Sequence, residues 1–158
     1  MTQAPRPRSR TASRVAAVQA LFQSEQAQEN PETVIDQFVR HRLGQIPGGD
    51  GYEDGRIPDA EVPLFSSIVR AAIRQQNTID AMVAEALPPD WPLSRIDPVL
   101  RALLRASGAE LATSGGAPAK VIINEYLDIA RGFFSGPEPG LANAVLDRLA
   151  RLLRQTEF

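Results

Sequence analysis

Apolar residues recur along most of this chain at steps of three and four positions, which is the spacing of one buried face of an α-helix. Before the prolines at 88–92, the pattern predicts helices over about 10–27, 31–43 and 61–87. The second helix begins with Asn30 and Pro31, a capping residue followed by the residue best suited to the first helical position. The third ends at LPPDWP, because closely spaced prolines cannot continue a helix.

The later part of the chain repeats this organisation. Asp97 and Pro98 form another pair of cap and first helical residue, and a helix over VLRALLRASGAEL follows them. A glycine pair separates it from a helix that starts at Pro118, and GPEPG precedes a last helix from Leu141. Residues 44–60 hold five glycines and two prolines without periodicity, which predicts a mobile connector. The chain lacks the alternating apolar runs of strands, so the predicted fold class is all-α.

Length and composition indicate one soluble globular domain, because 158 residues with 43% hydrophobic content suffice to bury a core. No apolar run reaches the roughly 18 residues that would cross a bilayer, so we expect a cytoplasmic protein without a membrane partner. The lack of cysteine and the single His41 leave no ligand set for a metal. The sequence also lacks a nucleophile beside a base and a phosphate-binding glycine loop, so we expect neither enzymatic activity nor a cofactor.

Positive charge is concentrated at the start of the chain. Residues 1–24 contain four arginines and no acid, so they carry +4, and the other residues carry −6 of the net charge of −2. These arginines are Arg6, Arg8, Arg10 and Arg14. An arginine-rich, proline-broken end on an acidic body is typical of an arm that binds a polyanion. We expect residues 1–9 to be a disordered basic arm, with an inert tail as the second interpretation and a transit peptide as the third.

Lys120 is the only lysine among 17 basic residues, and it lies in the first turn of a predicted helix. At about 100° per residue, Asn124 and Arg131 fall within about 40° of Lys120, opposite an apolar arc. A cation is mildly unfavourable in a first turn, whereas the free N–H groups there favour an anion. The stripe Lys120, Asn124 and Arg131 is therefore either a nucleic-acid contact or an ordinary solvated face, and the residues alone favour neither.

Four blocks stand out along the chain: SRVAAVQALFQ, DPVLRALLRASGAEL, PAKVIINEYLDIARGFF and ANAVLDRLARLL. In order and spacing they resemble the NusB family of transcription antitermination factors, in particular its alphaproteobacterial members. The most specific feature is K-V-x-I-N-E followed after a short loop by A-N-x-V-L-D. The resemblance implies a bundle of about seven helices in two halves, here 10–88 and 89–158, and a role without catalysis.

The resemblance also implies partners. Proteins of this family bind single-stranded boxA RNA together with NusE, the small-subunit ribosomal protein that doubles as a Nus factor. With other Nus factors and RNA polymerase, that complex promotes read-through of terminators, above all in ribosomal RNA operons. The implied RNA-binding residues are Arg6, Arg8, Arg10, Arg14, Lys120, Asn124, Arg131, Leu141 and Asn143, and the implied partner-binding residues are Phe22, Asp97 and Arg101.

Two departures from the family pattern affect these surfaces. Phe22 stands where the family commonly has tyrosine, which removes one hydrogen bond at the partner surface. Leu141 stands where it commonly has phenylalanine, which removes an aromatic ring whose stacking on a base is worth roughly 1–3 kcal/mol. We therefore expect RNA binding by this protein alone to be weak and to depend on the partner.

Other functions stay open at this point. A module of the same fold with another client is one, because a NusB-like domain also precedes the catalytic domain of some RNA cytosine methyltransferases. The chain ends at Phe158 without such a domain, which favours the antitermination role. A helical scaffold with an incidental basic tail is the second alternative, and an enzyme is the least supported.

Overall fold

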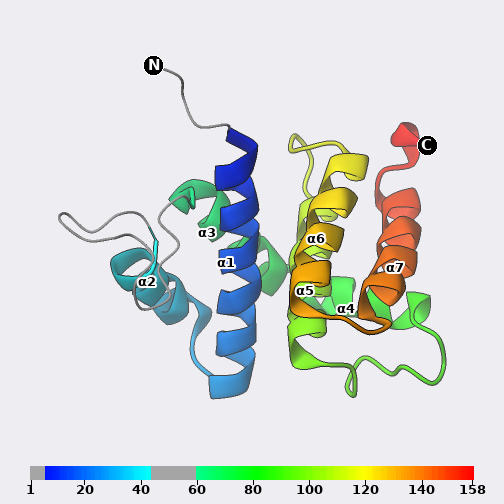
Figure 1. Ribbon diagram of the computed structural model, residues 1–158, viewed down its shortest axis with the longest axis horizontal. Coiled ribbons are helices and arrows are strands. Elements are labelled where there is room, and N and C mark those ends of the chain that lie inside the picture. Colours follow the sequence, from blue (N-terminus) through cyan, green and yellow to red (C-terminus); the bar gives the residue numbers. More distant parts are fainter. Residues whose placement is uncertain (1–5, 44–59) are drawn as a thin grey trace. The chain divides into compact units, whose positions relative to one another are not determined.

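The computed structural model describes residues 6–43 and 60–158, with side chains from Ser9 onward. Within these ranges the secondary structure is helical and contains no strand (Figure 1), so the predicted all-α class is confirmed. The elements are α1 Arg6–Ala27, α2 Pro31–His41, α3 Val62–Arg74, α4 Gln76–Ala86, α5 Pro98–Ala112, α6 Ala119–Phe133, α7 Glu138–Leu153 and the short 3₁₀ helix η2 Gln155–Glu157. None of the described helices is long and apolar enough to cross a membrane.

Both predicted caps are confirmed by hydrogen bonds. The Asn30 side chain accepts a bond of 2.8 Å from the backbone N–H of Glu32 at the start of α2. The Asp97 carboxylate accepts one of 2.7 Å from the backbone N–H of Val99 at the start of α5. In both helices a proline occupies the first turn, where its missing N–H costs no hydrogen bond.

Three helix boundaries differ from the prediction. Helix α1 begins at Arg6, so Arg6 and Arg8 lie on a helical backbone and not in a disordered arm, while residues 1–5 lie outside the described ranges. The helix predicted over 61–87 is two helices, α3 and α4, which meet at Gln75 with φ −109° and ψ 16°. Helix α7 starts at Glu138 because Pro139 is compatible with a first turn. The predicted connector 44–60 lies outside the described residues except for Ala60.

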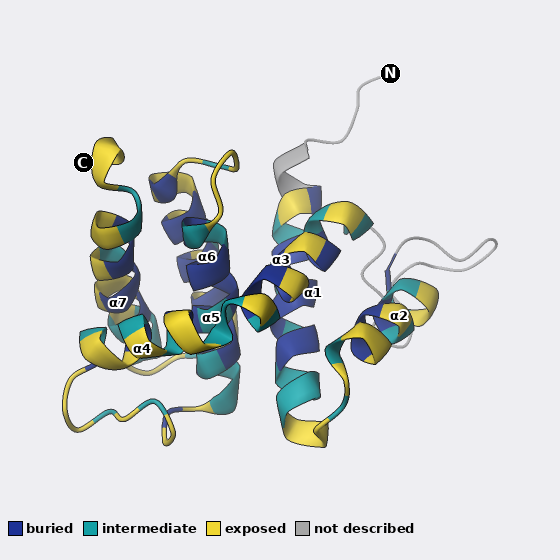
Figure 2. Ribbon diagram, turned by 180° about the vertical axis from the view of Figure 1, so that it is seen from behind, coloured by how far each residue is buried: buried dark blue, intermediate teal, exposed yellow. Residues whose placement is uncertain are grey.

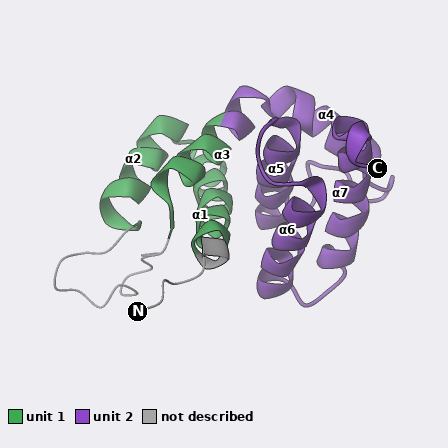
Figure 3. Ribbon diagram, turned by 90° about the horizontal axis from the view of Figure 1, so that it is seen from above, with its two compact units in different colours: residues 1–70 green, residues 71–158 purple. Residues whose placement is uncertain are grey.

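The chain forms two compact units, residues 1–70 and 71–158 (Figure 3). This division differs from the predicted one at residue 88, because α4 packs against α5 and α7 and so belongs to the second unit. In the first unit α1 packs on α2, and the Phe38 and Phe65 rings stack with centroids 5.5 Å apart. The Ser13 hydroxyl accepts a hydrogen bond of 2.6 Å from the Glu61 N–H, which joins α1 to the start of α3.

In the second unit α5, α6 and α7 pack against one another, and α4 covers part of α5 and α7. Their facing surfaces are buried, as the dark blue stripes of Figure 2 show. Gly108 permits the close approach of α5 and α4, since a Cβ atom there would lie 2.8 Å from Ile79 Cγ2. The Tyr126 hydroxyl donates a hydrogen bond of 2.6 Å to Glu110 Oε2, which links α6 to α5.

Candidate nucleic-acid interface

The exposed face of α6 carries the predicted polar stripe. Lys120, Asn124 and Arg131 are exposed there, as predicted. The buried residues of the helix are Ala119, Ile122, Ile123, Tyr126, Leu127, Ile129 and Ala130. Phe133 belongs to the predicted apolar arc but is 41% exposed, because it is the last residue of the helix, and its ring lies 6.3 Å from that of Phe134. The periodicity therefore located the stripe correctly, except at the helix end.

The cations of the stripe differ in their surroundings. Arg131 forms an ion pair of 3.0 Å with Asp128, and both side chains are more than half exposed. An exposed pair of this kind contributes at most about 1 kcal/mol, so a phosphate can replace the carboxylate at little cost. Beside Lys120, Val121 is 45% exposed, which adds an apolar element to the same surface.

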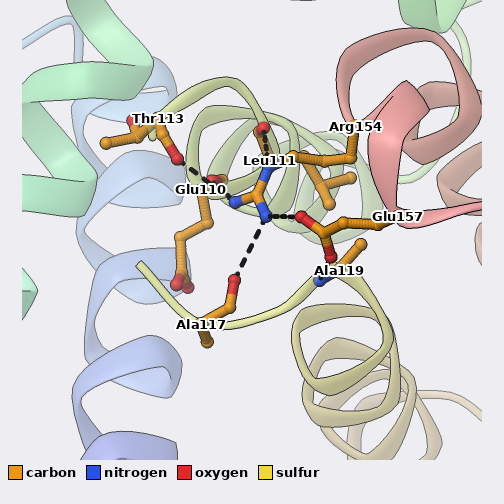
Figure 4. A network of polar contacts seen from close by, with 7 residues as sticks. All are labelled: Glu110, Leu111, Thr113, Ala117, Ala119, Arg154 and Glu157. Carbon is orange, nitrogen blue, oxygen red and sulfur yellow. Dashed lines mark hydrogen bonds and ion pairs between the residues drawn. The ribbon is translucent and has the colours of Figure 1, made fainter. Parts of the chain in front are cut away.

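The start of α6 differs from the expectation of an open anion site. The N–H of Ala119 donates a hydrogen bond of 2.8 Å to Glu157 Oε1, so this protein caps the helix with its own carboxylate (Figure 4). That bond, together with the hydrogen bond from Arg154, holds the pKa of Glu157 below its ordinary value. The N–H of Ala119 is therefore already bonded within the chain and is not open to an anion, whereas the side chain of Lys120 is exposed.

Leu141 and Asn143 lie in the first turns of α7 but do not share one surface. Leu141 is half-buried and Asn143 is exposed. Residues two apart on a helix point in directions about 160° apart, which explains the difference. Of this predicted pair, Asn143 is the residue accessible to a ligand.

The arginines of α1 also differ in how far their side chains are exposed. Arg10 is exposed, whereas Arg14 is 3% exposed and has an interaction partner within the chain. Val18 and Leu21, one and two turns after Arg14, are buried too, so Arg14 lies on an inward stripe of α1. This burial differs from the expected surface position of Arg14, and its contact with phosphate stays a prediction. The side chains of Arg6 and Arg8 lie outside the description.

The predicted partner-binding residues have contacts within the chain. Asp97 caps α5, and Arg101 donates hydrogen bonds of 3.0 and 3.2 Å to the backbone carbonyls of Leu93 and Ile96. These bonds close the loop that leads into α5. Phe22 is half-buried on α1, so part of its ring is accessible.

Two polar residues at the end of the chain were missed in the sequence. Arg154 and Glu157 contact residues about 40 positions earlier, and helical periodicity carries no sign of such contacts. An arginine at the end of a helix can bind the last carbonyls of that helix, but Arg154 binds carbonyls at the end of α5, so the sequence carries no local signal for these contacts. Among the described residues, no group of three or more His, Cys, Asp or Glu could hold a metal ion.

Comparison with known proteins gives consistent matches. The model of the NusB family matches residues 11–151. A transcription antitermination protein NusB from Granulibacter bethesdensis is 67% identical over 97% of this chain and 94% of its own length. The corresponding protein from Gluconobacter oxydans is 55% identical over 93% of this chain and 89% of its own length.

Solved structures agree with the sequence relatives on the fold. The T. maritima NusB structure has a TM-score of 0.71 and 24% identity, and the match covers 95% of this chain and 93% of that one. A crystal structure of antitermination factors NusB and NusE in complex with dsRNA contains a chain with a TM-score of 0.71 and 19% identity. That match covers 92% of this chain and 98% of the other.

Proposed function

This chain belongs to the NusB family, and from that premise we propose that it is a transcription antitermination factor that binds boxA-type RNA together with NusE. The observation that carries the proposal is the 67% identity to a transcription antitermination protein NusB across nearly the whole of both chains. The structure of NusB and NusE with dsRNA supports the choice of partners, because it contains a chain of the same fold.

The proposed setting is the cytoplasm, where the RNA–NusE complex joins other Nus factors and RNA polymerase. There it promotes processive transcription of ribosomal RNA operons. We propose that the protein itself acts only by binding, because RNA and NusE are both its ligands. If the two sites are coupled, each ligand raises the affinity for the other by the same factor.

The proposed RNA-binding residues are those predicted residues that the structure leaves accessible. In the second unit they are Lys120, Asn124 and Arg131 on α6, with the exposed Asn143 and the half-buried Leu141 on α7. Lysine and arginine suit phosphates, and the asparagine amide can both donate to and accept from a base edge. In the first unit we propose the exposed Arg10, and we include Arg6 and Arg8 because they precede it on the same helix.

The proposed NusE-binding residues are Phe22 in the first unit and Asp97 and Arg101 in the second. Asp97 and Arg101 contact nearby backbone groups, which supports a role in shaping the start of α5 as well as in presenting charge. With Leu141 in place of an aromatic residue, binding of RNA by the protein alone is expected to lose one stacking interaction. RNA affinity is therefore proposed to depend strongly on NusE.

Fluorescence anisotropy with a labelled boxA-like RNA tests this proposal, with a scrambled RNA of equal length as the control. We expect a preference for the boxA-like RNA and a marked gain in affinity when NusE is added. Equal binding of both RNAs, or no gain with NusE, would contradict the proposed function and favour a different client for the same fold.

Titration with salt tests the part played by α1. Each phosphate contact with a single strand contributes a slope of about −0.7 to log K against log salt. Because Arg14 is buried, α1 can supply at most three such contacts, with a total slope of about −2. A variant in which Arg6, Arg8 and Arg10 are replaced should lose this contribution to the salt dependence. An unchanged slope would exclude α1 from the RNA surface.

A further inference from the structure

The end of the chain folds back on the connection between α5 and α6. Helix α7 ends at Leu153, and the side chain of Arg154, which is only 13% exposed, points into this connection (Figure 4). Its guanidinium donates hydrogen bonds to four backbone carbonyl oxygens, those of Glu110 (3.2 Å), Leu111 (2.8 Å), Thr113 (3.1 Å) and Ala117 (3.3 Å). An arginine is suited to this task because its planar group carries five donors in a fixed arrangement.

Glu157 extends these contacts to α6. Its Oε2 accepts a hydrogen bond of 2.6 Å from Arg154, and its Oε1 accepts the bond of 2.8 Å from the Ala119 N–H. Pro118, at the N-cap position, provides no side-chain cap. The carboxylate of a residue 38 positions away therefore does the work of an N-cap for this helix.

The connection that Arg154 holds is weakly constrained by its own sequence. Gly115 adopts a φ of +84°, which favours glycine, and Gly116 follows it with no atom near the place of a Cβ. Without contacts from elsewhere, such a segment would leave the first turn of α6 free to fray. The contacts of Arg154 and Glu157 with both ends of this segment therefore hold the first turn of α6 in place.

We infer that Arg154 and Glu157 are positioning residues for RNA, which hold the first turn of α6 so that Lys120 meets a phosphate. The inference rests on the proposed function and extends it, because neither residue belongs to the exposed stripe itself. Lys120 directly follows the residue that Glu157 binds, so release of Ala119 shifts the backbone that carries the lysine. A charged side chain keeps its contribution to binding only while the backbone that carries it is held in place.

If Glu157 instead competed with RNA for the start of α6, its variants would behave differently. If its carboxylate merely blocked an anion site on Ala119, Glu157→Ala would strengthen RNA binding. In the positioning role, Glu157→Ala weakens binding, whereas Glu157→Gln largely preserves it, because the amide oxygen can still accept the bond from Ala119. Glu157→Ala therefore separates the roles by the sign of the change.

The test measures RNA affinity of the full chain by fluorescence anisotropy with the boxA-like RNA. We expect Arg154→Ala to weaken binding about three- to tenfold more than Arg151→Ala. Arg151 is the matched control, because it is an exposed arginine in the last turn of α7, and neither its ion pair with Asp147, at 3.0 Å, nor its contact with the Phe158 ring involves α6. Far-ultraviolet circular dichroism and thermal unfolding show whether each variant stays folded at the assay temperature.

A double-mutant cycle with Lys120→Ala tests whether Glu157 affects RNA affinity through Lys120. We expect Glu157→Ala to have little further effect on RNA affinity once Lys120 is replaced. Amide hydrogen exchange should also be faster at Ala119 and Lys120 in Glu157→Ala, and this readout needs no RNA. Additive losses in the cycle, or unchanged exchange, would overturn the inference and leave the proposed function intact. Absence of RNA binding by the wild type would refute the proposed function and this inference together.

Discussion

The tight packing of α5 against α4 at Gly108 leads to a specific stability prediction for Gly108→Ala. In a helix interior, alanine gains roughly 0.5–1 kcal/mol over glycine. Here the new methyl carbon would lie 2.8 Å from Ile79 Cγ2, well short of the roughly 3.5–4.0 Å at which two carbons pack. Ile79 is fully buried, and its branched side chain has one preferred rotamer in a helix, so it cannot simply turn away. Overpacking costs about 1–3 kcal/mol, which leaves a net loss of about 1 kcal/mol.

Urea unfolding of the wild type and Gly108→Ala measures this loss as a lower midpoint at an unchanged slope. Gly132→Ala is the matched control, because Gly132 also lies in a helix but has nothing within 4 Å of a Cβ, so this variant should be as stable as the wild type or more so. Replacement of Ile79 by alanine should reduce the cost of Gly108→Ala, since the clashing methyl group is removed. A Gly108→Ala protein more stable than the wild type would refute the argument.

Three further predictions each concern residues within one of the two units. Tyr126→Phe removes the hydrogen bond of 2.6 Å to Glu110 and should cost about 1–2 kcal/mol in urea unfolding, and an unchanged midpoint would show that the bond adds nothing. The pKa of Glu157 is lowered in the folded state, chiefly by the backbone hydrogen bond, so its stabilising contribution is present above the unfolded pKa and is lost as pH falls through the folded pKa. The stability difference between wild type and Glu157→Gln should therefore shrink on acidification, and a pH-independent difference would contradict this assignment. Arg10→Ala should reduce the salt slope of RNA binding by about 0.7 with little loss of stability, whereas Arg14→Ala should mainly destabilise the fold; the reverse pattern would contradict the burial of Arg14.

Those parts of the fold that depend on interactions between nearby residues could be predicted from the sequence. Asn30 and Asp97 start helices because a side-chain oxygen close to the backbone satisfies a free N–H, and both bonds are present. The spacing of apolar residues also located the buried face of α6, because all of the predicted arc except Phe133 at the helix end is buried. Such features depend on residues a few positions apart, and a sequence displays them directly.

The remaining features depend on contacts between distant residues. The interruption at Gln75 contains neither glycine nor proline; it lies where α3 ends, shortly after the first unit gives way to the second. Arg14 is charged, so sequence reasoning placed it at the surface, although its position one turn before Val18 matches the inward stripe of α1. The bond between Glu157 and Ala119 joins parts of the chain that no local pattern connects. The exposure of Lys120, Asn124 and Arg131 could therefore be predicted, but the contacts of Arg154 and Glu157 with the start of α6 could not.

The central claim is that Lys120 lies on a surface that binds boxA-type RNA in concert with NusE. The most direct test is the dissociation constant of a boxA-like RNA for the wild type and Lys120→Glu, each measured with and without NusE, alongside circular dichroism. We expect NusE to tighten RNA binding by the wild type, and Lys120→Glu to weaken RNA binding while helix content and NusE binding are preserved. An RNA affinity that responds neither to NusE nor to Lys120→Glu would contradict it.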